Sequence, residues 1–331
     1  MQDAFDAIRS LLSKMPAHPV GKAYFSDSRY ETFPLGRERF YPLEGDCRYL
    51  CGIDGGNQEL LGGANASLQF VRAYANVFEN DSRIHAEKHE FFALTKSVDG
   101  DAFETRLLPV RGGILQQAGV LQLSGTEVQD AEERSKAAQV GALSRRFAEW
   151  ALCEKMLEKF DDILVLKDGT LQTSVKKEAF YAERVWKKAG SRKFLAALSK
   201  TSTLLTTTGW ALSDAIQSLS PEGAWAYRWA AESRKSDHPA RIGFAKLHPL
   251  CQNAFRVEAH HANADIPWKT LSDNAKDPGF LGYPYVLVDA DRNAKVTNAE
   301  CASLKGRLQV RLREAPAFSR HTDAHAWLSK L

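Results

Sequence analysis

The sequence predicts an α/β fold in which a mixed β-sheet is flanked by helices. Two short apolar runs, 49–53 and 163–166, each lead within two residues into an Asp-Gly pair, as expected for buried strands that run into turns. Alternating segments that follow the first run are typical of antiparallel strands. A proline-free stretch rich in Ala, Glu, Lys, Arg and Leu, 130–160, is typical of a long helix.

Composition sets the class of protein. The chain has 331 residues with 44 Lys+Arg against 41 Asp+Glu, a net charge of +3, which is long enough for a substantial core. No run approaches the roughly 18 apolar residues that a membrane-spanning helix needs. The first 30 residues show no secretory signal, and five scattered Cys argue against a disulfide framework. We therefore expect a cytoplasmic protein that does not enter a membrane.

The N-terminal part differs in pattern from the rest. Phe5, Ile8 and the apolar residues up to Met15 recur at helical spacing, which predicts an amphipathic helix over 2–15. Pro and Gly then punctuate the chain up to residue 45, as in an extended connection. We expect two parts: the helix and connection, 1–45, and one domain, 46–331. The apolar face of the helix could contact a partner or a second subunit, or pack on its own domain.

Further elements follow in order along the chain. The expected strands after 49–53 are 68–77, a hairpin of 91–98 and 103–110 that turns at 99–101, then 163–166, 225–230, 241–248 and 254–260. Two further helices are expected over 283–295 and 300–313.

Two carboxylates, Asp54 and Asp168, stand where predicted strands break. An Asp-Gly pair favours turns wherever it occurs, so each could be structural. However, the predicted elements follow one another as in a ribonuclease-H-like sheet. Their order is a strand with Asp, antiparallel strands, a helix with a carboxylate and a second strand with Asp. That order brings carboxylates to one end of the sheet, where they can hold two divalent ions roughly 4 Å apart.

The predicted helix over 130–160 offers two acidic residues for this site, Glu149 and Glu154. They lie five residues apart, which is about 140° around the helix beyond one turn, so both cannot face the same site. The spacing to Asp168 favours Glu149, and Glu154 remains the alternative.

A basic segment follows the second Asp. Residues 176–200 carry eight basic and two acidic side chains, a local balance of +6 that leaves −3 for the rest of the chain. Such a segment can meet phosphates and release counterions, which predicts salt-sensitive DNA binding. The candidate contacts are Lys187, Lys188, Arg192 and Lys193. A merely solvated helix face is the alternative for these four side chains.

Six segments together resemble the successive motifs of the NurA nucleases. They are CGIDGGNQEL (51–60), RRFAEWALCEKML (145–157), LVLKDGTL (164–171), LSKTS (198–202), KLHPLCQNAFRVE (246–258) and GYPYVLVDADRNAKV (282–296). Each motif alone is short and of common residue types, but all six stand in the family's order over most of the chain. The resemblance implies a ribonuclease-H-like fold with family-specific insertions.

The resemblance also implies roles for individual residues. Asp54, Glu149 and Asp168 match metal-binding carboxylates of the family, and Tyr283 matches its active-site Tyr. Asp291 stands where many members have a metal-binding His, which keeps an oxygen ligand and should favour Mg²⁺ or Mn²⁺ further. Lys200, in LSKTS, is the expected phosphate ligand. The implied cofactor is Mn²⁺ or Mg²⁺, with two ions per site.

The implied function is that of a divalent-metal-dependent DNA nuclease. Members of the family act as 5′-3′ exonucleases and single-strand endonucleases, form homodimers, and work with the HerA-type hexameric ATPase translocase in end resection at double-strand breaks. Two alternatives remain: a weakly active or inactive docking subunit of a translocase complex, of which Asp291 would be a first sign, and a nuclease of an antiviral defence system.

Overall fold

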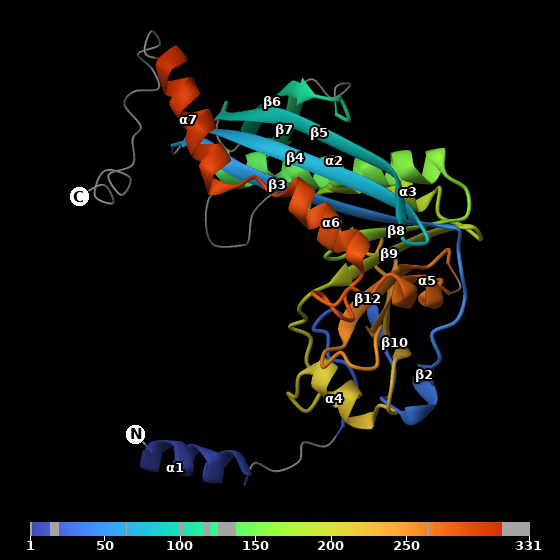
Figure 1. The fold of residues 1–331 in the computed structure, drawn as a ribbon. Coiled ribbons are helices and arrows are strands. Elements are labelled where there is room, and N and C mark those ends of the chain that lie inside the picture. The colour runs from blue at the N-terminus through green and yellow to red at the C-terminus, as the bar shows by residue number, and fades with distance from the viewer. Residues whose placement is uncertain are drawn as a thin grey trace.

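One mixed β-sheet organises the molecule. The computed structural model describes residues 2–13, 20–63, 65–98, 102–115, 120–124, 137–263 and 265–312. Within these residues, 12 strands form a sheet in the order β1-β10-β11-β12-β9-β8-β3-β4-β5-β6-β7, with β2 on β10 (Figure 1). The predicted mixed sheet with flanking helices is confirmed.

The centre of the sheet is parallel and its two halves are antiparallel. Strand β8 (Ile163–Asp168) pairs in parallel with β3 (Tyr49–Gly62) and with β9 (Lys193–Ser199). On the β3 side follow β4 (Ala66–Glu79), β5 (Ser82–Ser97), β6 (Ala102–Arg111) and β7 (Val120–Ser124). The β5–β6 hairpin was predicted, and its turn at 99–101 lies outside the described residues.

The other half of the sheet recruits part of the N-terminal connection. Beyond β9 lie β12 (Phe255–His260), β11 (Ala240–Lys246) and β10 (Trp225–Ser233). Strands β1 (Tyr30–Thr32) and β2 (Phe40–Tyr41), on either side of the short helix η1 (Arg37–Arg39), both pair with β10. Backbone pairing therefore ties residues 30–41 to the rest, and the expected boundary at residue 45 stays a prediction.

Helices cover both faces of the sheet, and each face has its own core. Helices α2 (Ala137–Lys159) and α3 (Lys176–Trp186) pack on one face, where Phe147 and Trp150 join Val165 in a buried cluster. Helix α6 (Tyr285–Ala294) packs on the other, where Val286 joins Leu164. Figure 1 shows α6 and α7 (Asn298–Leu312) in front of β3 and β4, with α2 behind. The alternation of side chains along β8 assigns its residues to the two cores.

The remaining helices are short or terminal. Helices α4 (Leu212–Leu219) and α5 (Trp268–Asp273) accompany the β10–β12 half. In α1 (Gln2–Ser13), the predicted apolar residues Phe5 and Ile8 are 58% and 51% exposed. Residues 130–136, 14–15 and 313 of the predicted helices lie outside the described residues. In the described part of the chain, no helix has the length and apolar character to cross a membrane.

One sequence-based expectation is wrong in detail: the first strand does not break at Asp54. Strand β3 continues to Gly62, because β4 pairs with it beyond Asp54 from Gly55↔Ala73 to Gly62↔Ser67. Only the parallel pairing with β8 stops there, after Ile53↔Lys167. The Gly-rich sequence after Asp54 is therefore strand whose small residues admit close neighbours, rather than a turn.

Candidate metal centre

Three aspartates from three elements meet at the end of the parallel strands. Asp54 lies on β3, Asp168 ends β8, and Asp291 lies on α6. Each offers one carboxylate oxygen such that the three oxygens all lie within 4.8 Å of one another. The parallel register, which pairs Ile53 with Lys167, places Asp54 directly beside Asp168. Of the predicted ligands, the structure thus brings together Asp54, Asp168 and Asp291.

A glycine in β3 lets α6 lie close enough to contribute Asp291. A Cβ added to Gly52 would lie 2.5 Å from the Val286 carbonyl oxygen of α6, a contact that real side chains do not make. Gly52 and Asp54 point to the same face because side chains alternate along a strand. The close approach of helix and strand therefore sets Asp291 over the part of β3 that carries Asp54.

The carboxylate cluster is short of positive charge. Burial, followed by the nearby carboxylates of Asp168 and Glu149, raises the pKa of Asp54 to about 7 against the opposing effect of the Gly55 N–H. That N–H donates to Asp54 Oδ1 at 2.7 Å. A divalent cation would relieve this repulsion, and an all-oxygen donor set suits Mg²⁺ or Mn²⁺. The residues present therefore fit a divalent metal ion.

Lys200 already supplies one positive charge at the cluster. Its Nζ lies 3.2 Å from both Asp168 Oδ2 and Asp291 Oδ1, and its side chain is 47% exposed. Burial opposes the charged form, but the two carboxylates outweigh it, so the pKa of Lys200 is raised. The loop that carries Lys200 is fixed to the end of β8, because Ser199 Oγ donates to the Gly169 carbonyl at 2.7 Å. Lys200 therefore lies at the cluster, and its role as a phosphate ligand stays a prediction.

Tyr283 lies against the same cluster from the loop before α6. Its hydroxyl donates to Asp168 Oδ1 at 3.4 Å, and its ring packs edge-on against Phe255 with centroids 5.2 Å apart. Burial, followed by the charges of Asp168 and Asp54, raises the pKa of Tyr283. The hydroxyl therefore remains a protonated hydrogen-bond donor at neutral pH.

Glu149 lies beside the cluster but on the opposite face of the sheet. Its carboxylate pairs with Lys167 Nζ at 2.9 Å and with Arg145, and the Glu149 and Lys167 side chains are only 3% and 6% exposed. Burial opposes ionisation of Glu149, yet Lys167 and Arg145 outweigh it and lower the pKa. A Cβ on Gly55 would lie 2.6 Å from Glu149 Oε1, so glycine is required for this approach. The structure thus does not join Glu149 to the three aspartates.

The cations around Glu149 contact the backbone of the two strands that carry Asp54 and Asp168. Arg145 donates to the Gly55 carbonyl at 3.4 Å, next to Asp54, and Lys167 donates to the Asp168 carbonyl at 3.3 Å. Sequence reasoning missed both cations. Two signals were present, since Arg145 precedes Glu149 by four residues and Lys167 must point away from the face of Asp168.

Glu154, the alternative to Glu149, lies elsewhere. Its carboxylate pairs with Arg184 at 3.0 Å and with Lys188 at 3.5 Å, both from α3 and the residues that follow it. Of the two glutamates, the structure therefore places Glu149 next to Asp54.

The predicted basic contacts lie at the other end of the strands. Arg192 and Lys193 pair with Asp162 and Asp161 at 2.9 and 3.1 Å, immediately before β8 begins. Asp168 lies six residue steps beyond Asp162, which is about 20 Å at about 3.3 Å per residue along β8. Lys188 pairs with Glu158 at 2.8 Å, and Lys187 is exposed just after α3. The structure does not bring these four residues to the carboxylate cluster, and their DNA contact stays a prediction.

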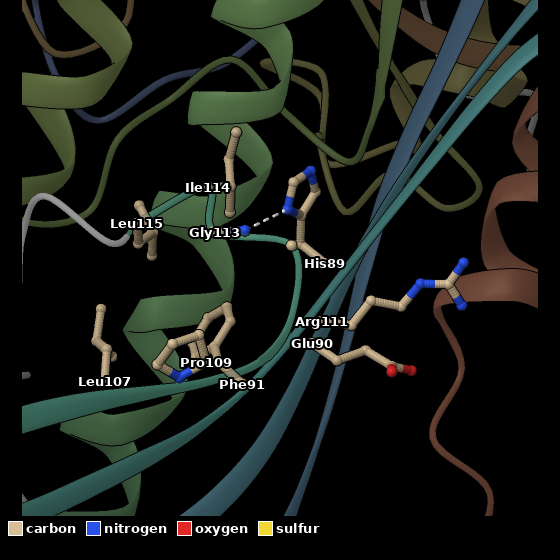
Figure 2. A pocket seen from close by; sticks show the side chains of 10 residues that line it. His89, Glu90, Phe91, Leu107, Pro109, Arg111, Gly113, Ile114 and Leu115 are labelled. Atoms are coloured by element: carbon tan, nitrogen blue, oxygen red, sulfur yellow. Dashed lines mark hydrogen bonds between the residues drawn. The ribbon is translucent and has the colours of Figure 1, made fainter.

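A pocket beside β5 and β6 is separate from the carboxylates and offers little chemistry. His89 projects toward its wall and accepts a hydrogen bond from the Gly113 N–H at 3.1 Å through Nδ1 (Figure 2). The other ring nitrogen lies 3.2 Å from Glu87. Burial lowers the pKa of His89. A neutral imidazole with both nitrogens engaged fixes the loop at Gly113 and is not available as a base.

Comparison with solved structures identifies the fold. The NurA nuclease from Sulfolobus solfataricus superposes with a TM-score of 0.53 at 11% identity, over 95% of this chain and 94% of that one. The catalytic domain of human Endonuclease V gives a TM-score of 0.40 at 10% identity, over 93% of this chain and 98% of that one. No protein-family profile and no curated protein sequence matches the chain. The predicted ribonuclease-H-like fold and the resemblance to NurA nucleases are thereby confirmed at the level of the fold.

Proposed function

We propose that this protein is a divalent-metal-dependent nuclease that hydrolyses phosphodiester bonds in DNA. The observation that carries the proposal is the convergence of Asp54, Asp168 and Asp291 at the end of the parallel strands of a NurA-like fold. The raised pKa of Asp54 supports it, because the cluster is stabilised when a cation enters. We propose Mn²⁺ or Mg²⁺ as the cofactor, with two ions per site.

Bound divalent ions would neutralise charge on the departing oxygen and make the attacking water more nucleophilic. The three aspartates would hold them. Lys200, which reaches over the cluster with a half-exposed ammonium, would bind a non-bridging oxygen of the scissile phosphate. The Tyr283 hydroxyl remains protonated and would donate to the phosphate or to the attacking water. Both side chains would thereby orient the phosphate for in-line attack.

Glu149 receives a different role in this proposal. Its two carboxylate oxygens are engaged by Arg145 and Lys167, and these cations hold the backbone beside Asp54 and at Asp168. We assign to Glu149 the function of fixing the distance between the two strands. Direct metal ligation by Glu149, as the family resemblance implies, requires the pair with Lys167 to open.

The finer features of the proposal rest on the motif resemblance. They are 5′-3′ exonuclease and single-strand endonuclease action, a homodimer, and work with a HerA-type hexameric ATPase translocase in end resection. The exposed apolar residues Phe5 and Ile8 of α1 offer a surface for either protein contact.

The test is cleavage of 5′-end-labelled DNA with Mn²⁺, comparing the wild type with Asp54→Ala. We expect metal-dependent release of label by the wild type. The cleavage rate of the variant should be at least about 100-fold lower, since one of the three carboxylates that would hold the metal is removed. The matched control is Asp161→Ala, an 89% exposed aspartate at the other end of β8, which should cleave as the wild type does. A wild type without metal-dependent cleavage, both alone and with its translocase, contradicts the proposal.

An inactive docking subunit is the second candidate, and one observation favours it. The Lys200 ammonium lies 3.2 Å from both Asp168 and Asp291, so these two aspartates are partly neutralised without an ion. Calorimetric titration with Mn²⁺ separates the two candidates. A nuclease should bind Mn²⁺, and Asp54→Ala should abolish that binding. A docking subunit should show no Mn²⁺ binding that depends on Asp54.

A further inference from the structure

Two exposed apolar side chains lie on neighbouring loops, one of which leads to Tyr283 of the candidate site. Leu250 is 74% exposed and Phe280 is 41% exposed. Leu250 follows β11 and Phe280 precedes α6, and their loops touch where a Cβ on Gly282 would lie 2.5 Å from Cys251. Such exposure costs free energy in water, about 25 cal/mol per Å² of apolar surface. Exposed apolar side chains of this kind are candidates for a ligand-binding surface.

The backbone ties Phe280 to the cluster. The Phe280 carbonyl accepts a hydrogen bond from the Tyr283 N–H at 2.9 Å, and the Tyr283 hydroxyl donates to Asp168. Three residues of chain span at most about 11 Å. Phe280 is therefore within one or two nucleotides of a phosphate held at the aspartates.

A guanidinium lies on the Phe280 ring. The Arg292 Cζ atom is 5.2 Å from the ring centroid, and Arg292 directly follows Asp291 on α6. Arg292 is exposed, and within the described ranges no ion pair engages it. A cation on an aromatic ring is a stabilising pair, and it leaves the guanidinium free to meet an anion.

We propose that Leu250, Phe280 and Arg292, here called the apolar rim, form a stacking platform for an unpaired base next to the scissile phosphate. The proposal rests on the nuclease function proposed above and assigns to these three residues the contact with the unpaired strand, which is single-stranded DNA or a DNA end whose terminal bases are unpaired. An exposed aromatic ring with cations beside it is the combination that binds single strands, since every base has a π-face and every nucleotide a phosphate.

Charge favours this occupant over a protein surface. Arg292 belongs to the rim, Lys200 Nζ lies 5.7 Å from the ring centroid of Tyr283, and Lys295 is exposed one turn beyond Asp291. A base inside a duplex is covered by its neighbours on both faces and cannot meet the ring. The rim therefore selects unpaired strands, which gives the site a preference that the carboxylates alone do not supply.

The chain offers a matched control for a test of the rim. Phe180 on α3 is 55% exposed and also has two cations near its ring, Lys177 and Arg184, each at 6.0 Å. It lies on the helical layer of α2 and α3, opposite the face of Asp168. Phe280→Ala and Phe180→Ala thus remove the same side chain from similar surroundings, and only the first is beside the carboxylates.

The experiment measures binding of a fluorescein-labelled single-stranded 20-mer and of the matching blunt duplex by anisotropy in EDTA, which prevents cleavage. Phe280→Ala should weaken single-strand binding about 5- to 100-fold, and Phe280→Trp should restore it. Phe180→Ala should leave it unchanged, and duplex binding should not depend on Phe280. A loss below about 5-fold, an equal loss in Phe180→Ala, or no single-strand binding by the wild type overturns the proposal.

Two further measurements fix the interpretation. An abasic site is moved along the 20-mer. At one position it should weaken binding by the wild type as much as Phe280→Ala does. At that same position it should not weaken binding by Phe280→Ala any further. A change of oligomeric state in Phe280→Ala, measured by light scattering, would instead show a protein contact and overturn the proposal. Mn²⁺-dependent cleavage is assayed on the same samples: its absence in the wild type refutes the nuclease, whereas cleavage without a Phe280 effect refutes only the rim.

Discussion

The metal-free protein should become more stable when Asp54 is replaced by asparagine. Asparagine keeps the shape of the side chain and can still accept the hydrogen bond from the Gly55 N–H, now 2.7 Å long. It removes a negative charge that is buried among the carboxylates of Asp168, Glu149 and Asp291. A native ligand that destabilises its own apoprotein is expected only where a cation is meant to bind.

The magnitude follows from the pKa of Asp54. The pKa rises from 3.8 to about 7 on folding. At about 1.4 kcal/mol per pH unit this corresponds to a cost of about 4 kcal/mol. Between pH 4 and 7 the folded state binds more protons at Asp54 than the unfolded state, so stability falls as pH rises, and above about pH 7 the cost is constant. At pH 5 only about 2 kcal/mol of it has accrued.

Urea unfolding in EDTA measures this cost. The free energy of unfolding of Asp54→Asn should exceed that of the wild type by about 4 kcal/mol at pH 8 and by about 2 kcal/mol at pH 5. Titrating groups far from Asp54 are common to both proteins, so the difference reports Asp54 and its coupling to the neighbouring carboxylates. Mn²⁺ at 100 times its dissociation constant should add about 2.7 kcal/mol to the wild type and much less to the variant.

If Asp54→Asn is no more stable than the wild type at pH 8 without metal, the charge of Asp54 does not destabilise the metal-free protein and the prediction is wrong. A difference that does not change between pH 5 and pH 8 would show that the variant acts through packing rather than through charge. Asp161→Asn, at the exposed far end of β8, is the control and should change neither value by more than about 0.5 kcal/mol.

Three further predictions concern the cations and the third aspartate. Lys167→Met leaves the buried Glu149 with Arg145 alone and should lower the free energy of unfolding by about 3 kcal/mol, measured with urea; adding Glu149→Gln should recover at least half of that loss. Asp291→Ala should weaken Mn²⁺ binding at least about 10-fold in calorimetry while unfolding in EDTA changes by less than about 1 kcal/mol, because its side chain is 50% exposed. Lys200→Ala should reduce the slope of log affinity for DNA against log salt by about 1, as expected when one phosphate contact is lost.

Much of the fold could be predicted because strands and helices leave local patterns. The buried strand before Asp168 and the proline-free run of α2 are visible in composition and period alone. The site was predictable where those patterns end in a carboxylate, as at Asp168. The continuation of β3 past Asp54 was not, because a Gly-rich segment is strand only when β4 and the neighbouring helices are already in place.

The meeting of carboxylates from separate elements could be predicted from the sequence, since parallel strands place their ends at one edge of a sheet. Which of these carboxylates share a face is visible only in the folded protein. Asp54, Asp168 and Asp291 do, whereas Glu149 lies behind the sheet with Lys167. The tertiary structure also decided that Arg192 and Lys193 meet acidic partners about 20 Å from the site. Charge along a chain is a local property, but the partner of a charge depends on which end and which face of an element packing brings together.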